Sequence, residues 1–320
     1  MPRPPDGSRG GAAIRLLVVL ACSLVLPLAQ LAGAQERPFL NAADFGGIQA
    51  ALDALPPAGG TVLVAAGSYA VAEKIRLRSH VELRGEGMER TILTLADGAN
   101  DHLLSNASLT QGNTGITIRD LGLRGNAANQ TEWSFGVRLV NVTDSLVLNV
   151  EASDFSKDGF YLGYNRENGV RNVRVSGCRA VGNRRYGLAL KHGTDNLVDG
   201  CTFEANGLAE EGGALKLGPD AGLDASGNRV IGNRALANHS GFVLLSVEGY
   251  NARVADNVLC GNAAEGNLAA GFQDSRGINN RFLGNMASGN GVDFDLGSAV
   301  VEDAAQEACA LPPLPEALAR

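Results

Sequence analysis

The sequence contains 320 residues, with a formal net charge of −7 at pH 7, 42 glycines and 5% aromatic residues. Many glycines and few large rings favour a chain that turns often and packs small side chains in rows. The acidic balance argues against nucleic acid as a partner. Because no Pro/Ser-rich linker divides the chain, we expect one elongated domain and a monomeric protein.

The first 34 residues are predicted to be an export signal. Three arginines lie within the first 15 residues, an apolar run covers 14–31, and Ala32-Gly33-Ala34 provides the small residues that precede cleavage. Cleavage near Ala34 removes three arginines and one acid, which leaves about nine more acidic than basic residues. No later stretch is apolar enough to span a bilayer. We predict a periplasmic or secreted protein, with a lipid anchor at Cys22 as the alternative.

A capping helix is predicted near the start of the mature domain, 35–320. Phe45, Ile48, Leu52 and Leu55 share one helical face over about 44–55, before a Pro-Pro pair ends the helix. The open end of a stack of strands would expose its core, so we expect this helix to cover it. Strands at 61–64 and 80–84 are predicted to start the first coils.

A block that ends in asparagine recurs through the second half of the sequence. The spacing between successive blocks is 23, 32, 24 and 28 residues. Short β-type runs at such a period are typical of a β-solenoid, here with roughly seven to nine coils and a tail over about 300–320. We expect one asparagine per coil to form a structural ladder, with amides bonded across a strand spacing of about 4.8 Å. The predicted ladder comprises Asn183, Asn206, Asn238, Asn262 and Asn290.

Four cysteines remain after export. Cys178 and Cys201 take the same position in adjacent coils, where either a disulfide or a stacked pair of buried thiols fits. A bond between Cys260 and Cys309 is also left open. The compartment permits disulfides without requiring them.

A second series of short runs follows the asparagines. In each run, strand alternation sends two apolar residues inward and leaves the residues between them facing solvent. One frame aligns Asp158, Tyr186, Glu211 and Ser240. The inward residues are Phe160, Leu162, Leu188, Leu190, Leu215, Leu217, Phe242 and Leu244.

Several segments resemble the pectate-lyase-like superfamily of right-handed parallel β-helices. They are IQAALD at 48–53, GGTVLVAAGSY at 59–69, VELRGEG at 81–87 and TIL at 91–93. The resemblance covers nearly all of the mature chain. It implies an all-β, right-handed, single-stranded parallel β-helix with an N-terminal capping helix, in a superfamily of lyases, hydrolases, epimerases and non-catalytic proteins.

Within this superfamily the sequence looks most similar to the catalytic modules of mannuronan C5-epimerases. Their Tyr-Gly-Phe-Asp-Pro-His motif should fall at 158–163, where the sequence reads DGFYLG and its tyrosine, aspartate and histidine are absent in place. Arg185 stands where these epimerases carry an arginine. The resemblance therefore implies a carbohydrate substrate, while the familiar epimerase residues are missing.

Basic residues gather in one stretch of this acidic chain. Positions 166–192 hold one acid, Glu167, against seven basic residues, and such a patch suits an acidic polysaccharide such as alginate or pectin. Ordinary solvated turns are the alternative explanation. The basic residues are Arg166, Arg171, Arg174, Arg179, Arg184, Arg185 and Lys191.

The outward positions of the second series predict a site for abstraction of the C5 proton of a uronate. Arg185 would bind the carboxylate, Lys191 would act as base with its pKa lowered by the stacked Lys216, and Tyr161 or Tyr186 would shuttle the proton. The four candidate catalytic residues are Arg185, Lys191, Tyr161 and Tyr186, and candidate substrate-binding residues flank them. The flanking residues are Arg138, Asp158, Arg184, Glu211 and Lys216.

Two other functions remain open at this stage. The face could bind glycan without catalysis, or Asp158 and Glu211, two coils and about 9.6 Å apart, could be the carboxylates of an inverting glycoside hydrolase. We predict no cofactor and no metal centre, although calcium could bind surface carboxylates. The sequence thus predicts a carbohydrate-active lyase or epimerase most strongly.

Overall fold

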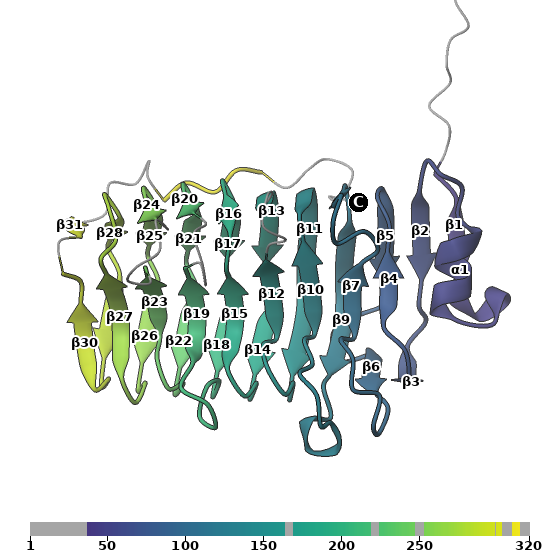
Figure 1. Cartoon of the computed structure of the whole chain (residues 1–320), viewed down its shortest axis with the longest axis horizontal. Helices are drawn as coiled ribbons and strands as arrows, with labels where there is room; N and C mark the ends of the chain where they lie inside the picture. Colours follow the sequence, from purple (N-terminus) through teal and green to yellow (C-terminus); the bar gives the residue numbers. More distant parts are fainter. Residues whose placement is uncertain are drawn as a thin grey trace, which may run out of the picture. The chain divides into compact units, whose positions relative to one another are not determined.

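The computed structural model describes residues 37–163, 169–218, 224–246, 253–297, 299–302 and 309–313. The predicted signal peptide, Arg166, Glu167 and most of the predicted tail lie outside these residues. The described strands stack in parallel, coil upon coil, as Figure 1 shows. They form a right-handed parallel β-helix, so the predicted fold class is confirmed.

One face of the helix is a nine-stranded sheet in which each coil contributes one strand. The number of coils over the described residues is therefore within the predicted range. In spatial order the strands are β4 (Ile75–Leu77), β7 (Leu104–Asn106), β10 (Val137–Val140), β12 (Phe160–Gly163), β15 (Tyr186–Leu190), β19 (Gly213–Leu217), β23 (Phe242–Leu245), β27 (Ala270–Ser275) and β30 (Val292–Asp295).

The remaining strands form a second, 22-stranded sheet, in which the long β9 and β11 each pair with strands on both sides of a bend. Its strands are β1 (Phe39–Asn41), β2 (Gly60–Leu63), β3 (Gly67–Val71), β5 (Val81–Arg84), β6 (Thr91–Leu95), β8 (Asn113–Thr114), β9 (Thr117–Arg124), β11 (Val142–Ser153), β13 (Val170–Ser176), β14 (Arg179–Val181), β16 (Gly193–Thr194), β17 (Leu197–Asp199), β18 (Thr202–Glu204), β20 (Ala225–Ser226), β21 (Arg229–Ile231), β22 (Arg234–Leu236), β24 (Val254–Ala255), β25 (Val258–Cys260), β26 (Ala263–Glu265), β28 (Arg281–Leu283), β29 (Met286–Ser288) and β31 (Val300–Glu302).

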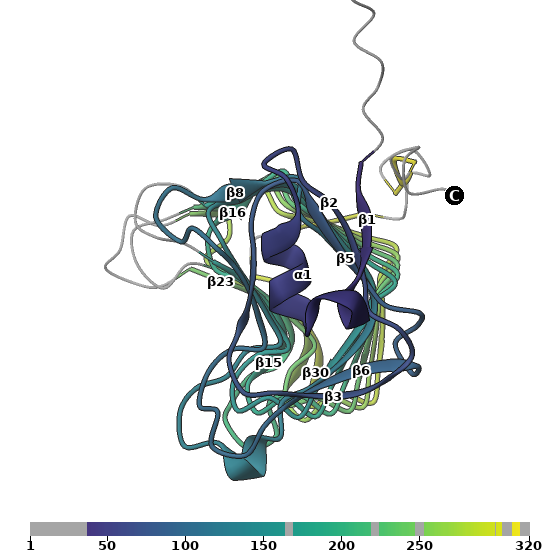
Figure 2. The same cartoon turned by 90° about the vertical axis from the view of Figure 1, so that its right-hand side faces the viewer.

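The N-terminal end of the coil is covered by a short helix, which lies across the open end of the coil in Figure 2. The predicted single helix is split into a 3-10 turn, η1 (Ala42–Phe45), and α1 (Ile48–Ala54), because Gly46 adopts a left-handed φ of 75° between them. Leu52 and Leu55 are buried as predicted. Phe45 is 37% exposed, so it does not belong to the buried face. Strand β1, which pairs with β2 ahead of the helix, was not predicted.

Inward side chains of the nine-stranded sheet stack in register from coil to coil. Phe160, Leu188, Leu215, Phe242 and Phe272 are successive partners, and each is fully buried. Burial of such a side chain contributes about 1.5–3 kcal/mol. The predicted inward positions of this sheet are therefore confirmed.

The corners of the coil are held by asparagine ladders, in which each Oδ1 accepts from the backbone N–H and the side-chain amide of the preceding coil. Asn238, for example, accepts both bonds of Asn206 at 2.9 Å. Three such ladders run along the second half of the helix. Their members are Asn183, Asn206, Asn238, Asn267 and Asn290; Asn233, Asn262 and Asn285; and Asn196, Asn228, Asn257 and Asn280.

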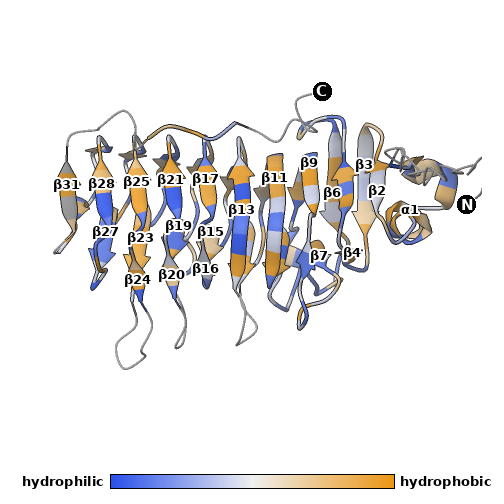
Figure 3. Ribbon diagram, turned by 90° about the horizontal axis from the view of Figure 1, so that it is seen from above, coloured by the Kyte–Doolittle hydropathy of each residue, from blue (hydrophilic) through white to orange (hydrophobic). Residues whose placement is uncertain are grey.

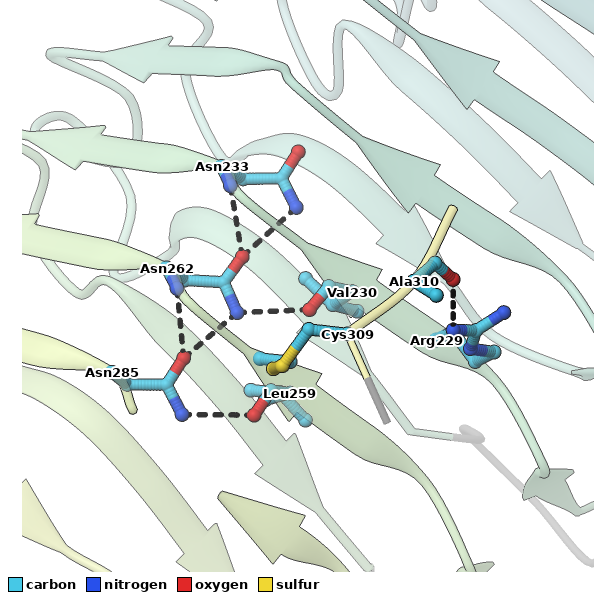
Figure 4. The surroundings of a disulfide bond; sticks show 9 residues. Arg229, Val230, Asn233, Leu259, Asn262, Asn285, Cys309 and Ala310 are labelled. Carbon is cyan, nitrogen blue, oxygen red and sulfur yellow. Dashed lines mark hydrogen bonds between the residues drawn. A yellow bond between two sulfur atoms is a disulfide. The ribbon is translucent and has the colours of Figure 1, made fainter. Parts of the chain in front are cut away.

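The predicted register is wrong at one member. Asn262 stacks between Asn233 and Asn285 (Figure 4), and the partner of Asn238 is Asn267. The spacing along the predicted ladder is therefore 23, 32, 29 and 23 residues.

The cysteine pairs differ in their bonding. Cys178 and Cys201 are free, buried and stacked, with the Cys178 N–H donating to the Cys201 Sγ at 3.4 Å. Cys260 and Cys309 form a disulfide, with Cα atoms 5.6 Å apart. This bond fixes the described tail residues 309–313 beside the coil, where Figure 3 shows them along the row of β25, β21 and β17.

Candidate functional site

Glycines at one corner of the coil place the first residues of the site. A Cβ at Gly187 would lie 2.6 Å from the Phe203 ring, and a Cβ at Gly159 would lie 2.9 Å from Nδ2 of Asn183, so both positions face the packed interior. Only glycine fits such a close approach. Asp158 and Tyr186 directly precede these glycines: Asp158 lies two residues before β12, and Tyr186 is the first residue of β15.

Asp158 and Arg185 form a bidentate ion pair at this corner. The Arg185 Nε and Nη2 donate to the two carboxylate oxygens at 2.9 and 2.6 Å, and the Tyr186 N–H donates to Oδ1 at 3.1 Å. Asp158 is fully buried, while the Arg185 side chain is 21% exposed. The prediction that Asp158 faces solvent is therefore wrong, because its charge is compensated inside the structure.

Three cationic groups surround the ring of Tyr186. The Arg185 Cζ lies 5.5 Å from the ring centroid, the Lys191 Nζ 5.7 Å and the Lys216 Nζ 5.8 Å, all within the range of cation–π attraction. Lys191 is 1% exposed and Lys216 6%, which corrects the prediction that both face solvent. The register partner of Lys216 is Ala189, so the two lysines meet over the tyrosine and are not stacked directly.

Tyr161 lies two coils before Lys216, in a second group of side chains. Arg138 is its register partner, and the Phe135 ring packs against the Tyr161 ring with centroids 4.9 Å apart. His102 packs against Phe135 in turn, with centroids 4.8 Å apart. Burial, together with the charge of Arg138, lowers the pKa of His102 to about 4, so this imidazole is neutral at pH 7.

Glu211 and Arg184 lie at the margin of this face and are both exposed. The partner of Tyr186 in the next coil is Gly213, so Glu211 falls two residues ahead of its predicted place. The two carboxylates of the hydrolase alternative thus have unlike surroundings: Asp158 is buried against Arg185, and Glu211 is exposed before β19 begins.

Sequence reasoning missed a group at the edge of the face. The Lys157 Nζ lies 4.4 Å from the ring centroid of Trp133 and forms an ion pair with Glu210. The Arg185 N–H donates to the Lys157 carbonyl at 2.9 Å, which joins this group to the Asp158 corner. The available signal was Trp133 itself, the single tryptophan of the sequence.

The coil and the polar and aromatic side chains outside its nine-stranded sheet define a parallel β-helix protein. The chain belongs to the family described as periplasmic copper-binding protein (NosD), whose model matches residues 78–271. A comparison with curated proteins finds no match. Among the described residues, no helix is long and apolar enough to cross a membrane.

Solved structures share the fold at low identity. The tailspike gp49 of Acinetobacter baumannii bacteriophage Fri1, a capsular polysaccharide depolymerase, matches with a TM-score of 0.54 at 15% identity, over 82% of this chain and 57% of that one. This chain thus spans little more than half of the phage protein. A pectin methylesterase solved in complex with a hexasaccharide matches with a TM-score of 0.51 at 12% identity, over 88% of this chain and 100% of the methylesterase chain. The A-module of mannuronan C-5 epimerase AlgE4 from Azotobacter vinelandii matches with a TM-score of 0.37 at 20% identity, over 83% of this chain and 100% of the module.

Copper, which the family description names, does not fit the described residues. In this part of the chain no three His, Cys, Asp or Glu side chains gather in a way that could hold a metal ion. The thiols of Cys178 and Cys201 are buried, and burial raises the pKa of Cys201, so this sulfur stays protonated and is a poor ligand.

Proposed function

We propose that the protein acts on an acidic polysaccharide by abstraction of the C5 proton of a uronate, as a lyase or as a C5-epimerase. The observation that carries the proposal is the convergence of Arg185, Lys191 and Lys216 around the Tyr186 ring on the outer face of the helix. In this proposal the chain is exported and its signal peptide is cleaved near Ala34. The similarity in fold to a capsular polysaccharide depolymerase and to a pectin methylesterase supports the choice of a polysaccharide.

The first requirement of this reaction is a cationic environment for the carboxylate. When the C5 proton leaves as H⁺, the electron pair of the C–H bond moves toward the carboxylate, whose negative charge grows in the transition state. Lys191 and Lys216 supply positive charge there, and Asp158 fixes the orientation of the Arg185 guanidinium. The exposed Arg184 and Glu211 and the half-buried Arg138 extend the binding face.

The second requirement is a pair of groups that move protons. We propose Lys191 as the base and the hydroxyl of Tyr186 or Tyr161 as the acid. In a lyase the C4–O bond then breaks, a C4=C5 double bond forms and the acid protonates the leaving oxygen. In an epimerase the acid returns a proton to C5 from the opposite side, and no bond of the chain is broken.

A glycan-binding protein without catalysis is the second candidate. The observation that favours it is the burial of Asp158 and Lys191, since a paired and covered charge is also what a purely structural role requires. The surroundings of Glu211 give no comparable support to the hydrolase alternative.

Incubation of the mature protein with alginate and pectate separates these functions. The lyase predicts new ultraviolet absorbance from an unsaturated uronate, and the epimerase predicts solvent deuterium at C5 without chain cleavage. Calorimetric binding with neither signal would establish the binding protein. The absence of both binding and chemistry with either polymer would refute the proposal for these uronates.

A further inference from the structure

Trp133 stands out on the surface because it is large, apolar and exposed. Its exposed fraction is 64%, the highest of any aromatic side chain among the described residues. It lies between η2 (Ala127–Asn129) and β10, in a loop whose helical turn projects from the coil at the foot of Figure 2. Single exposed apolar residues are common, so exposure alone assigns no role.

The indole is held in place by a cation of the next coil. The Lys157 ammonium lies 4.4 Å from the ring centroid, and Glu210, two coils beyond Lys157, holds that ammonium in an ion pair. Lys157 is 8% exposed, and its ammonium lies over the indole. One side of the indole is thus packed against Lys157, and much of the rest is open to solvent.

This arrangement adjoins the Tyr186 site directly. Lys157 precedes Asp158 in sequence, its N–H donates to the Ser134 carbonyl at 3.1 Å, and its own carbonyl accepts from Arg185. Trp133 and Arg185 therefore flank Lys157 on the coils before and after it. Adjacent coils are about 4.8 Å apart along the helix axis, so the coils of Trp133 and Arg185 are about 9.6 Å apart.

We propose that Trp133 is a stacking platform for a sugar ring of the acidic polysaccharide, in a subsite next to the Tyr186 site. The C–H face of a pyranose packs on the open side of the indole, as apolar groups pack on aromatic rings. Lys157 sets the orientation of the ring, and the cations around Tyr186 favour a carboxylate-bearing sugar over a neutral one. The inference rests on the proposed function for the identity of the ligand.

The single tryptophan makes this platform directly measurable, because all tryptophan emission comes from Trp133. We expect alginate or pectate hexasaccharides to change this emission saturably, and maltohexaose, which carries no carboxylate, to change it far less. Trp133→Ala should weaken binding of the acidic hexasaccharide about tenfold, equivalent to about 1.4 kcal/mol. Trp133→Phe should retain part of the affinity, and in a turnover assay KM should rise while kcat stays unchanged.

Leu208→Ala is the matched control, because Leu208 is 55% exposed in the loop before β19. This variant keeps the reporter and should bind as the parent does. Two results would overturn the platform. One is an unchanged affinity of Trp133→Ala for the acidic hexasaccharide. The other is unchanged tryptophan emission of the parent protein when calorimetry shows that the hexasaccharide binds. C5 chemistry with an unaltered KM in Trp133→Ala would refute the platform and leave the proposed function standing. Tryptophan-dependent binding without C5 chemistry would uphold the platform and refute the catalysis.

Discussion

The buried ion pair between Asp158 and Arg185 contributes to the stability of the coil. The carboxylate has no exposure to water, and the two hydrogen bonds from Arg185 and one from the Tyr186 backbone compensate its charge. Removing one partner of a buried ion pair leaves the other charge unpaired, which costs about 3–5 kcal/mol. Arg185 therefore contributes to folding as well as to the proposed binding of a carboxylate.

We expect Arg185→Ala to lower the free energy of unfolding by about 3–5 kcal/mol, because Asp158 then stays buried without a counter-ion. The double variant Asp158→Asn/Arg185→Gln should recover much of this loss, since it buries no charge. Urea denaturation measures both values. The exposed neighbour Arg184 provides the control, and Arg184→Ala should change stability by less than about 0.5 kcal/mol. Equal stability of Arg185→Ala and the parent would show that Asp158 needs no partner.

The outward direction of several site residues could be predicted from alternation, but their burial could not. Phe160 and Leu190 pointed inward as expected, which left Tyr161 and Lys191 on the other side of their strands. Lys191 is nevertheless 1% exposed, because side chains on the outer face cover one another. Contacts between neighbouring coils, such as Lys216 over Tyr186, depend on register that a single sequence does not specify.

At the scale of elements, the asparagine ladders explain both the success and the error of the sequence prediction. Within one coil the ladders are five residues apart, as Asn228, Asn233 and Asn238 show. The same glycine and asparagine pattern therefore occurs at three corners, and the block that ends at Asn262 was assigned to a neighbouring corner. The prediction of the fold was unaffected by this error, because each corner has the same ladder geometry.

We expect Asn238→Ala to lower the free energy of unfolding by several kcal/mol. It removes the acceptor of the Asn206 backbone N–H and of the Asn206 amide, and also the donor to the Phe203 carbonyl. Each buried polar group left without a partner costs about 1–3 kcal/mol.

Asn290→Ala is the matched control, because this half-buried residue ends the same ladder. Its substitution should cost less, since solvent reaches the groups it releases. Thermal unfolding of both variants tests the difference. Comparable losses at the two positions would contradict the ladder account.

At the scale of the whole β-helix, the described coils form a one-dimensional stack, in which each coil contacts its neighbours and the ends open most readily. The described tail crosses this stack lengthwise. From the disulfide at Cys260 it passes Arg229, which donates to the Ala310 carbonyl at 2.6 Å, and Arg174, which donates to the Pro312 carbonyl at 2.9 Å. The tail therefore links β25, β21 and β13 in addition to their strand pairing. Figure 4 shows the contacts at Cys309 and Arg229.

We expect Cys309→Ser to loosen the C-terminal coils more than the N-terminal ones. The disulfide closes a segment of 49 residues, and without it the cluster of Leu197, Ile231 and Leu283 loses its cover. Hydrogen exchange should accelerate in β25 and β28 while β5 and β9 stay protected. Cys178→Ser is the control, because Cys178 is a buried free thiol that forms no disulfide with the tail. Uniform acceleration along the helix would show that the tail does not act locally.

The disulfide between Cys260 and Cys309 also depends on the redox conditions of the compartment in which the chain folds. Thiols stay reduced in the cytosol and are oxidised outside it, so the lengthwise clasp can close only after the chain has left the cytosol. If the predicted export signal operates, Cys260 and Cys309 stay reduced in the precursor, and no disulfide hinders the unfolded chain during translocation. Oxidation of Cys260 and Cys309 after export would then form the disulfide and fix the tail along the coil.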